Sequence, residues 1–160
     1  MSAENPRPRR LGRLETVFVD SPIYFVTSCT ANRRKVLAQS PIQHALVEFG
    51  ESGPAHGAWL GRYVLMPDHL HAFVALDEEK ITLATWMKSL KNSLSKSLRA
   101  CGISAPHWQK TFFDHVLRGS ESYSEKWEYV CENPVRAGLV KVSEDWPFQG
   151  EIFSLEYQSD

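Results

Sequence analysis

Two apolar segments separated by only two residues constrain the fold more than any other feature of this sequence. Residues 59–66 and 69–76 are both rich in strand-forming side chains, and Pro67-Asp68 between them is typical of a tight turn. The two segments therefore predict an antiparallel hairpin. Alternation along its second strand puts His69 and His71 on one face, with their Cα atoms about 6 to 7 Å apart.

This His-x-His pair has two interpretations. Histidine is the commonest metal ligand, and two neutral imidazoles at this spacing can bind one ion. The alternative is that His69 and His71 are hydrogen-bonded core side chains, as most buried histidines are. The spacing alone leaves both interpretations open.

Length and composition indicate one globular domain. A chain of 160 residues can bury about two-thirds of its unfolded surface. Its 42% apolar and 23% charged residues are ordinary for such a domain. We find no signal-peptide pattern and no apolar run of about 18 residues, so we expect a cytoplasmic protein without a membrane span. The three cysteines, Cys29, Cys101 and Cys131, are interpreted as reduced structural thiols.

Charge is unevenly distributed although the net charge is only −1. We expect a basic amino-terminal arm over residues 1–20, a folded domain over 21–150 and an acidic tail over 151–160. The arm carries Arg7, Arg9, Arg10 and Arg13. Residues 80–113 contain lysines and arginines but no acidic residue, so a basic middle region favours contact with phosphates.

Hydrophobic periodicity predicts the other elements. Residues 23–30 are typical of a buried strand, and Ser40-Pro41 is typical of a helix start, with that helix ending at Gly50. Residues 82–100 predict an amphipathic helix with a basic outer face, and residues 107–117 a final strand. This order predicts a ferredoxin-like α+β sandwich, βαββαβ, with an antiparallel sheet.

A third helix near the carboxyl end carries an oddly placed tyrosine. Ser122-x-x-Glu125 resembles a capping box that opens this helix, and Asn133-Pro134 is expected to close it. The apolar residues of this helix lie on one side of it, and Tyr129 lies on the other side, with Asn133 one turn later. Tyr129 is therefore either simply exposed or a nucleophile. A phenol can attack a phosphate that a divalent cation polarises, and the Asn133 carbonyl oxygen suits a hard ion.

These motifs together resemble a known family. Pro67-Asp-His69-Leu-His71 is similar to the HUH motif, two histidines around a bulky apolar residue. The sequence also contains Trp108-Gln109-Lys110, Phe113-Asp114-His115 with Arg118, and Tyr129-Val-Cys-Glu-Asn133-Pro134-Val-Arg136-Ala-Gly138-Leu-Val140. Over residues 24–148 the chain resembles the REP-associated tyrosine transposases, relatives of the single-tyrosine HUH transposases of small insertion sequences.

The resemblance implies a ferredoxin-like core that binds single-stranded hairpin DNA. Such proteins cut and rejoin palindromic DNA through a 5′-phosphotyrosine, using Mg²⁺ or Mn²⁺. The resemblance implies that His69, His71 and Asn133 are metal ligands and that Tyr129 is the nucleophile. It also implies that the protein is nucleoid-associated. Two other functions on the same fold stay open: a DNA-hairpin-binding regulator without catalysis, and a hydrolytic metal nuclease. Tyr129 could act with the histidines of its own chain or of a second copy, so self-association is also open.

Basic residues in three regions are candidates for phosphate contacts. They are Arg33, Arg34 and Lys35 after the first strand, Lys88 and Lys91 on the second helix, and Lys110 and Arg118 near the last strand. Trp108 could stack on an unpaired base, but a position in the core is the alternative.

Overall fold

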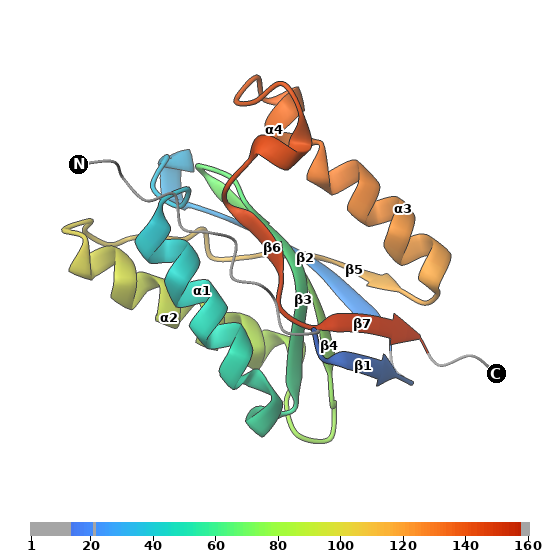
Figure 1. The fold of residues 1–160 in the computed structure, drawn as a ribbon. Helices are drawn as coiled ribbons and strands as arrows, with labels where there is room; N and C mark the ends of the chain where they lie inside the picture. The colour runs from blue at the N-terminus through green and yellow to red at the C-terminus, as the bar shows by residue number, and fades with distance from the viewer. Residues whose placement is uncertain (1–13, 21, 158–160) are drawn as a thin grey trace.

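A five-stranded antiparallel sheet forms the centre of the protein (Figure 1). The computed structural model describes residues 14–20 and 22–157. The strands are β2 (Ile23–Cys29), β3 (Ala58–Leu65), β4 (His69–Leu76), β5 (Phe113–Leu117) and β6 (Gln149–Glu151). They pair in the order β5-β2-β4-β3-β6. Without β6, the chain runs β2-α1-β3-β4-α2-β5, which confirms the expected βαββαβ order.

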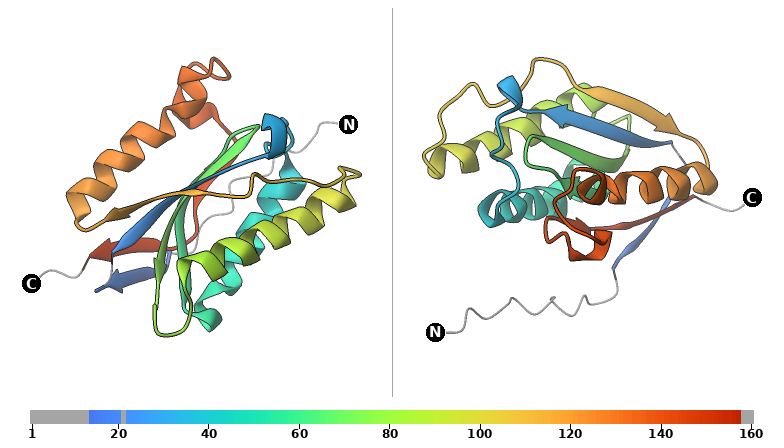
Figure 2. Two further views of the ribbon diagram at one scale, coloured as in Figure 1. Left: turned by 180° about the vertical axis from the view of Figure 1, so that it is seen from behind. Right: turned by 90° about the horizontal axis from the view of Figure 1, so that it is seen from above.

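Helices cover both faces of this sheet. Figures 1 and 2 show α1 (Ser40–Ser52) and α2 (Leu83–Ala100) on one face and α3 (Ser120–Cys131) across the other. Because strand side chains alternate, β4 packs Leu70 and Val74 toward the α1–α2 layer and Phe73 toward α3. Two separate cores result, and α3 brings the carboxyl-terminal part of the chain to the histidine face.

The predicted hairpin is confirmed. β3 and β4 pair antiparallel, with Val64 opposite His71 and Leu65 opposite Leu70. The Met66 N–H donates to the His69 carbonyl oxygen at 2.8 Å and closes the turn around Pro67 and Asp68. This turn fixes where β4 begins, and so fixes both histidines at the start of a buried strand.

The first helix differs from expectation at both ends. Gln39, not Ser40, precedes its first turn, and the helix continues past Gly50 to Ser52. Gly50 lies inside the helix, and a Cβ there would come 2.4 Å from the Ile152 Cδ1 atom, so glycine permits Ile152 to pack closely against the helix. The second helix is as expected, since Thr82 caps it by accepting from the Thr85 N–H at 3.2 Å.

The last strand is shorter than the predicted 107–117. Only Phe113–Leu117 pairs with β2, and before it a single bridge joins Thr30 to Trp108. The Trp108 indole donates to the Lys91 carbonyl oxygen at 3.2 Å and to the Ser95 hydroxyl at 3.0 Å. These bonds hold the segment against α2 and away from the strand ladder. Trp108 is partly buried and packs against the α1–α2 core, which favours the core interpretation over base stacking.

The tyrosine helix also has other bounds than predicted. It begins at Ser120, after Gly119, and not at the Ser122 capping box. Asn133 does not close the helical region but begins α4 (Asn133–Arg136). Pro134 is in the first turn of α4, where its missing N–H has no helical partner to lose, so proline is compatible with a new helix.

Both chain ends contribute strands that the sequence analysis did not foresee. β1 (Thr16–Val19) pairs in parallel with β7 (Ser154–Tyr157), and β6 pairs with β3. Residues expected in the arm and the acidic tail, 16–19 and 151–157, thus belong largely to strands. The four arginines of the expected arm lie outside the described residues.

Truncation of Leu94 on α2 should test the α1–α2 core. Leu94 is fully buried against the sheet, so we expect Leu94→Ala to lower the free energy of unfolding by about 2–5 kcal/mol. Urea denaturation measures this change. Leu139→Ala is the matched control: with Leu139 45% exposed, it should change stability by no more than about 0.5 kcal/mol. Equal effects of the two substitutions would contradict this core.

Candidate active site

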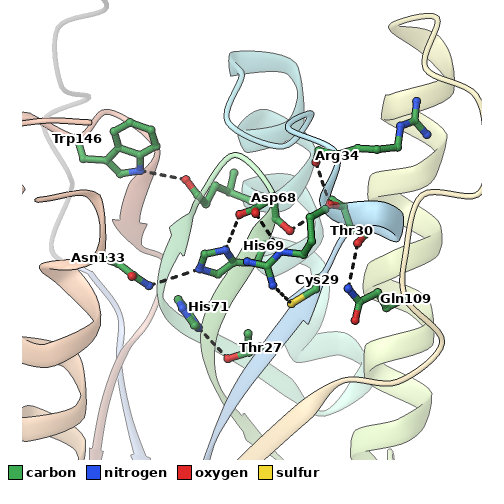
Figure 3. Close-up of polar contacts among 12 residues, drawn as sticks. Thr27, Cys29, Thr30, Arg34, Asp68, His69, His71, Gln109, Asn133 and Trp146 are labelled. Carbon is green, nitrogen blue, oxygen red and sulfur yellow. Dashed lines mark hydrogen bonds and ion pairs between the residues drawn. The ribbon is translucent and has the colours of Figure 1, made fainter. Parts of the chain in front are cut away.

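The two histidines are held in defined orientations (Figure 3). His69 Nδ1 lies 2.8 Å from the Asp68 Oδ1 atom, and His71 Nδ1 lies 2.8 Å from the Thr27 hydroxyl oxygen. The ring centroids are 4.7 Å apart. Because Nδ1 of each ring is engaged by protein, Nε2 is the nitrogen that each ring offers to a ligand.

Asn133 faces the same nitrogen of His69. Its side-chain nitrogen is 3.5 Å from His69 Nε2 (Figure 3). Rotation of the amide by half a turn exchanges nitrogen and oxygen, so the carbonyl oxygen can take this position. The start of α4 therefore brings an amide to the histidine pair.

The protonation states suit ligation. Burial lowers the pKa of His71 to about 3, and the nearby His69, Lys126 and Arg136 lower it further. Burial alone would raise the pKa of Asp68, but hydrogen bonds from His69 and Arg33 outweigh it and lower that pKa. His71 is thus neutral at neutral pH, as a metal ligand must be, and Asp68 is a carboxylate that orients His69.

Tyr129 and the three candidate ligands line one surface pocket of about 340 Å³. The lining residues are Phe25, Thr27, His69, His71, Phe113, Lys126, Tyr129, Val130, Asn133 and Arg136. Tyr129 is 63% exposed, so its hydroxyl can meet a large substrate. A larger pocket of about 680 Å³ lies where α1 ends and α2 begins, but it holds none of the four.

Two cations flank the tyrosine. The Arg136 guanidinium carbon is 4.1 Å from the centroid of the Tyr129 ring, and Lys126 Nζ is 5.9 Å from it. Lys126 Nζ also lies 4.7 Å from the centroid of the Phe25 ring. Together they give the pocket positive charge beside the neutral His71, which favours a phosphate.

Tyr123, the other tyrosine of α3, is not an accessible nucleophile. It is 7% exposed, and its ring centroid is 5.0 Å from that of Phe73 in the core. Burial raises the pKa of its phenol. Trp127 also contacts Phe73, so the apolar side of the helix, which excludes Tyr129, packs against the sheet.

Two of the three basic residues after β2 bind other parts of the protein. Arg33 Nε donates to Asp68 Oδ2 at 2.9 Å, and its Nη1 lies 3.1 Å from the Cys29 sulfur. Arg34 Nη1 donates to the Ser104 carbonyl oxygen at 2.7 Å. Arg33 thereby supports the carboxylate that orients His69, while Lys35 is exposed.

The other basic candidates do not form one surface. Lys88 and Lys91 belong to α2, which lies on the opposite side of the sheet from α3 (Figure 2), and α3 carries Lys126 and Tyr129 of the pocket. Lys91 Nζ donates to the Gln109 carbonyl oxygen at 3.1 Å, and burial lowers its pKa. Lys110 and Arg118 are exposed on either side of β5 along the chain.

Sequence reasoning missed the two cations beside the tyrosine. Lys126 precedes Tyr129 by three residues, and this spacing on a helix could have identified it. No helical spacing identifies Arg136, because Arg136 is on α4 and lies beside Tyr129 only as a result of the turn between α3 and α4.

In residues 14–20 and 22–157, no group of three or more histidines, cysteines, aspartates and glutamates could hold a metal ion. Cys29, Cys101 and Cys131 are free thiols, as expected. Among the helices of the described part, none is long and apolar enough to cross a membrane.

The fold is one that transposases adopt. Residues 19–129 match the family model described as "Transposase IS200 like". The chain belongs to this family, so it is a member of a family of DNA-processing enzymes.

Known relatives agree with the resemblance found in the sequence. The chain is 28% identical over 134 residues to the REP-associated tyrosine transposase of Escherichia coli (strain K12), covering 82% of this chain and 77% of that protein. It is also similar to a solved REP-associated tyrosine transposase bound to a REP hairpin, with a TM-score of 0.66 and 26% identity. That likeness covers 83% of this chain and 78% of the solved chain.

Proposed function

We propose that this protein is a metal-dependent single-strand DNA transesterase that cleaves and rejoins hairpin-forming palindromic DNA through a 5′-phosphotyrosine. The pocket that gathers Tyr129, His69, His71 and Asn133 is the observation that carries the proposal. The solved relative bound to a REP hairpin supports hairpin DNA as the partner.

The residues present fit a divalent cation. His69 and His71 would each bind it through Nε2, and Asn133 through its amide oxygen. Two imidazoles with one carbonyl oxygen favour Mn²⁺ over Mg²⁺ by ligand softness, although either fits. Such an ion, when bound, would polarise the scissile phosphate and make its phosphorus more electrophilic.

Tyr129 performs the proposed covalent step. Its phenol oxygen loses a proton and attacks the phosphorus, the bond from phosphorus to the 3′ oxygen breaks, and the 3′ hydroxyl leaves with a proton. The 5′ phosphate stays on Tyr129. Lys126 and Arg136 offset the negative charge that develops beside the ring. One phosphodiester is exchanged for another, so a second 3′ hydroxyl can reverse the step and rejoin DNA.

A denaturing gel separates this proposal from its two rivals. Wild-type protein is mixed with an end-labelled hairpin oligonucleotide and Mn²⁺, with and without a chelator. We expect cleavage together with a covalent protein–DNA band, both lost with chelator. A binding regulator would give neither product, and a hydrolytic nuclease would cleave without the covalent band.

Phosphate contacts through α2 can be tested by salt dependence. If the hairpin reaches Lys88 and Lys91, replacing either with alanine should weaken binding to all hairpins alike and lower the salt slope by about 0.7 to 0.9. Fluorescence anisotropy over a salt series measures this. Lys80→Ala, the same change at a lysine that precedes the first residue of α2, should leave the slope unchanged. A loss selective for one sequence would contradict phosphate contact.

A further inference from the structure

Phe113 exposes an aromatic ring at the edge of the pocket. It is 58% exposed, although a large apolar side chain is normally buried. It lines the same pocket as Tyr129 and His71. The proposed chemistry at Tyr129 makes no use of it.

The strand register sets how far Phe113 lies from the histidine pair. Phe113 pairs with Thr27, and Thr27 pairs with His71. Neighbouring strands are about 4.8 Å apart, so Phe113 lies about 10 Å from His71 across the sheet. A nucleotide next to a phosphate held at His71 can span this distance. β5 is the edge strand of the five-stranded sheet, so a base can approach the Phe113 ring from solvent.

The surroundings favour a nucleic acid strand over an apolar partner. Lys126 and Arg136 line the pocket with Phe113 and supply positive charge. His115, two residues on, projects from the same face of β5 and is also exposed. A flat ring beside cations is the arrangement on which proteins stack the bases of single-stranded nucleic acids.

We propose that Phe113 is a stacking platform for one unpaired nucleobase next to the scissile phosphate. This inference rests on the proposed function, because it needs a DNA strand that passes through the pocket. The base would be single-stranded and outside the paired stem of the hairpin, because only an unstacked base offers a free face. Stacking tolerates any base, so Phe113 would position the strand without reading its sequence.

Equilibrium binding without divalent metal tests the platform apart from cleavage. Fluorescence anisotropy compares wild type with Phe113→Ala, Phe113→Leu and Phe113→Tyr on a hairpin with and without its single-stranded flank. Phe113→Ala should weaken binding of the flanked hairpin by about 5- to 150-fold. Phe113→Leu should also bind weakly because it lacks a flat face, whereas Phe113→Tyr should bind like wild type. The bare hairpin should bind all four proteins equally.

Abasic sites locate the partner of Phe113. Replacing flanking nucleotides by abasic ones, one at a time, should reveal a single position at which Phe113→Ala no longer has an effect. Equal binding of wild type and Phe113→Ala to every oligonucleotide would overturn the platform, even if the covalent band forms normally. If the effect occurs at one base but no covalent band forms, the platform stands and the proposed chemistry fails.

Discussion

Tyr129→Phe should abolish both cleavage and the covalent adduct while the protein still folds and binds hairpin DNA. The substitution removes only a hydroxyl from a ring that is 63% exposed, so stability should change by no more than about 1 kcal/mol. Binding should persist because contacts with phosphates elsewhere supply most of the affinity. A phenyl ring cannot attack phosphorus, so the chemical step is lost. The denaturing gel with Mn²⁺ measures cleavage and adduct together.

Tyr123→Phe is the matched control on the same helix. It removes the same hydroxyl from a buried ring that does not line the pocket, so cleavage and adduct should both remain. A Tyr129→Phe protein that cleaves as fast as wild type would exclude Tyr129 as the nucleophile. Loss of activity in both variants would point to a disturbed helix and not to a lost nucleophile.

His69→Ala should lower cleavage by more than about 100-fold, because it removes a proposed ligand and not only a group that orients one. Excess Mg²⁺ should not restore the activity, and Mn²⁺ binding followed by calorimetry should weaken in parallel. The protein should stay folded, because His69 lies at the start of β4 and not in its buried middle.

His44→Ala is the control for a lost imidazole. His44 is exposed on α1 and pairs there with Glu48, so its removal should change neither metal binding nor cleavage. If His69→Ala bound Mn²⁺ as tightly as wild type, the proposed ligand set would be wrong. Cleavage that survives a chelator would contradict a metal-dependent reaction.

The sequence predicted those elements that are specified by local patterns. Pro67-Asp68 is a turn between two apolar segments, so the residue pattern of the segments and the turn residues together predict both strands of the β3–β4 hairpin. The strand ending at Leu117 was predicted too long, because a tertiary bond from Trp108 to α2 holds its first residues elsewhere. β7 was missed because its partner, β1, lies at the other end of the chain.

The site was predictable to the extent that its residues stand in short motifs. The spacing of His69 and His71 places both on one face, and Tyr129 and Asn133 share one side of the helical segment. Arg136 and Phe113 could not be predicted by the same reasoning, because each joins the pocket through packing between distant elements. The Asp68 carboxylate, held between Arg33 and His69, likewise depends on a loop contact across 35 residues of sequence.

The parallel pairing of β1 with β7 makes the folding of each strand depend on the other. Each strand is the other's partner in a two-stranded sheet, and Leu155 of β7 packs directly against Gly61 of β3. Loss of either strand leaves the other without its hydrogen-bonded partner, and loss of β7 also removes Leu155 from its contact with Gly61. A truncation that removes β1 and a truncation that removes β7 are therefore expected to disrupt the same two-stranded sheet.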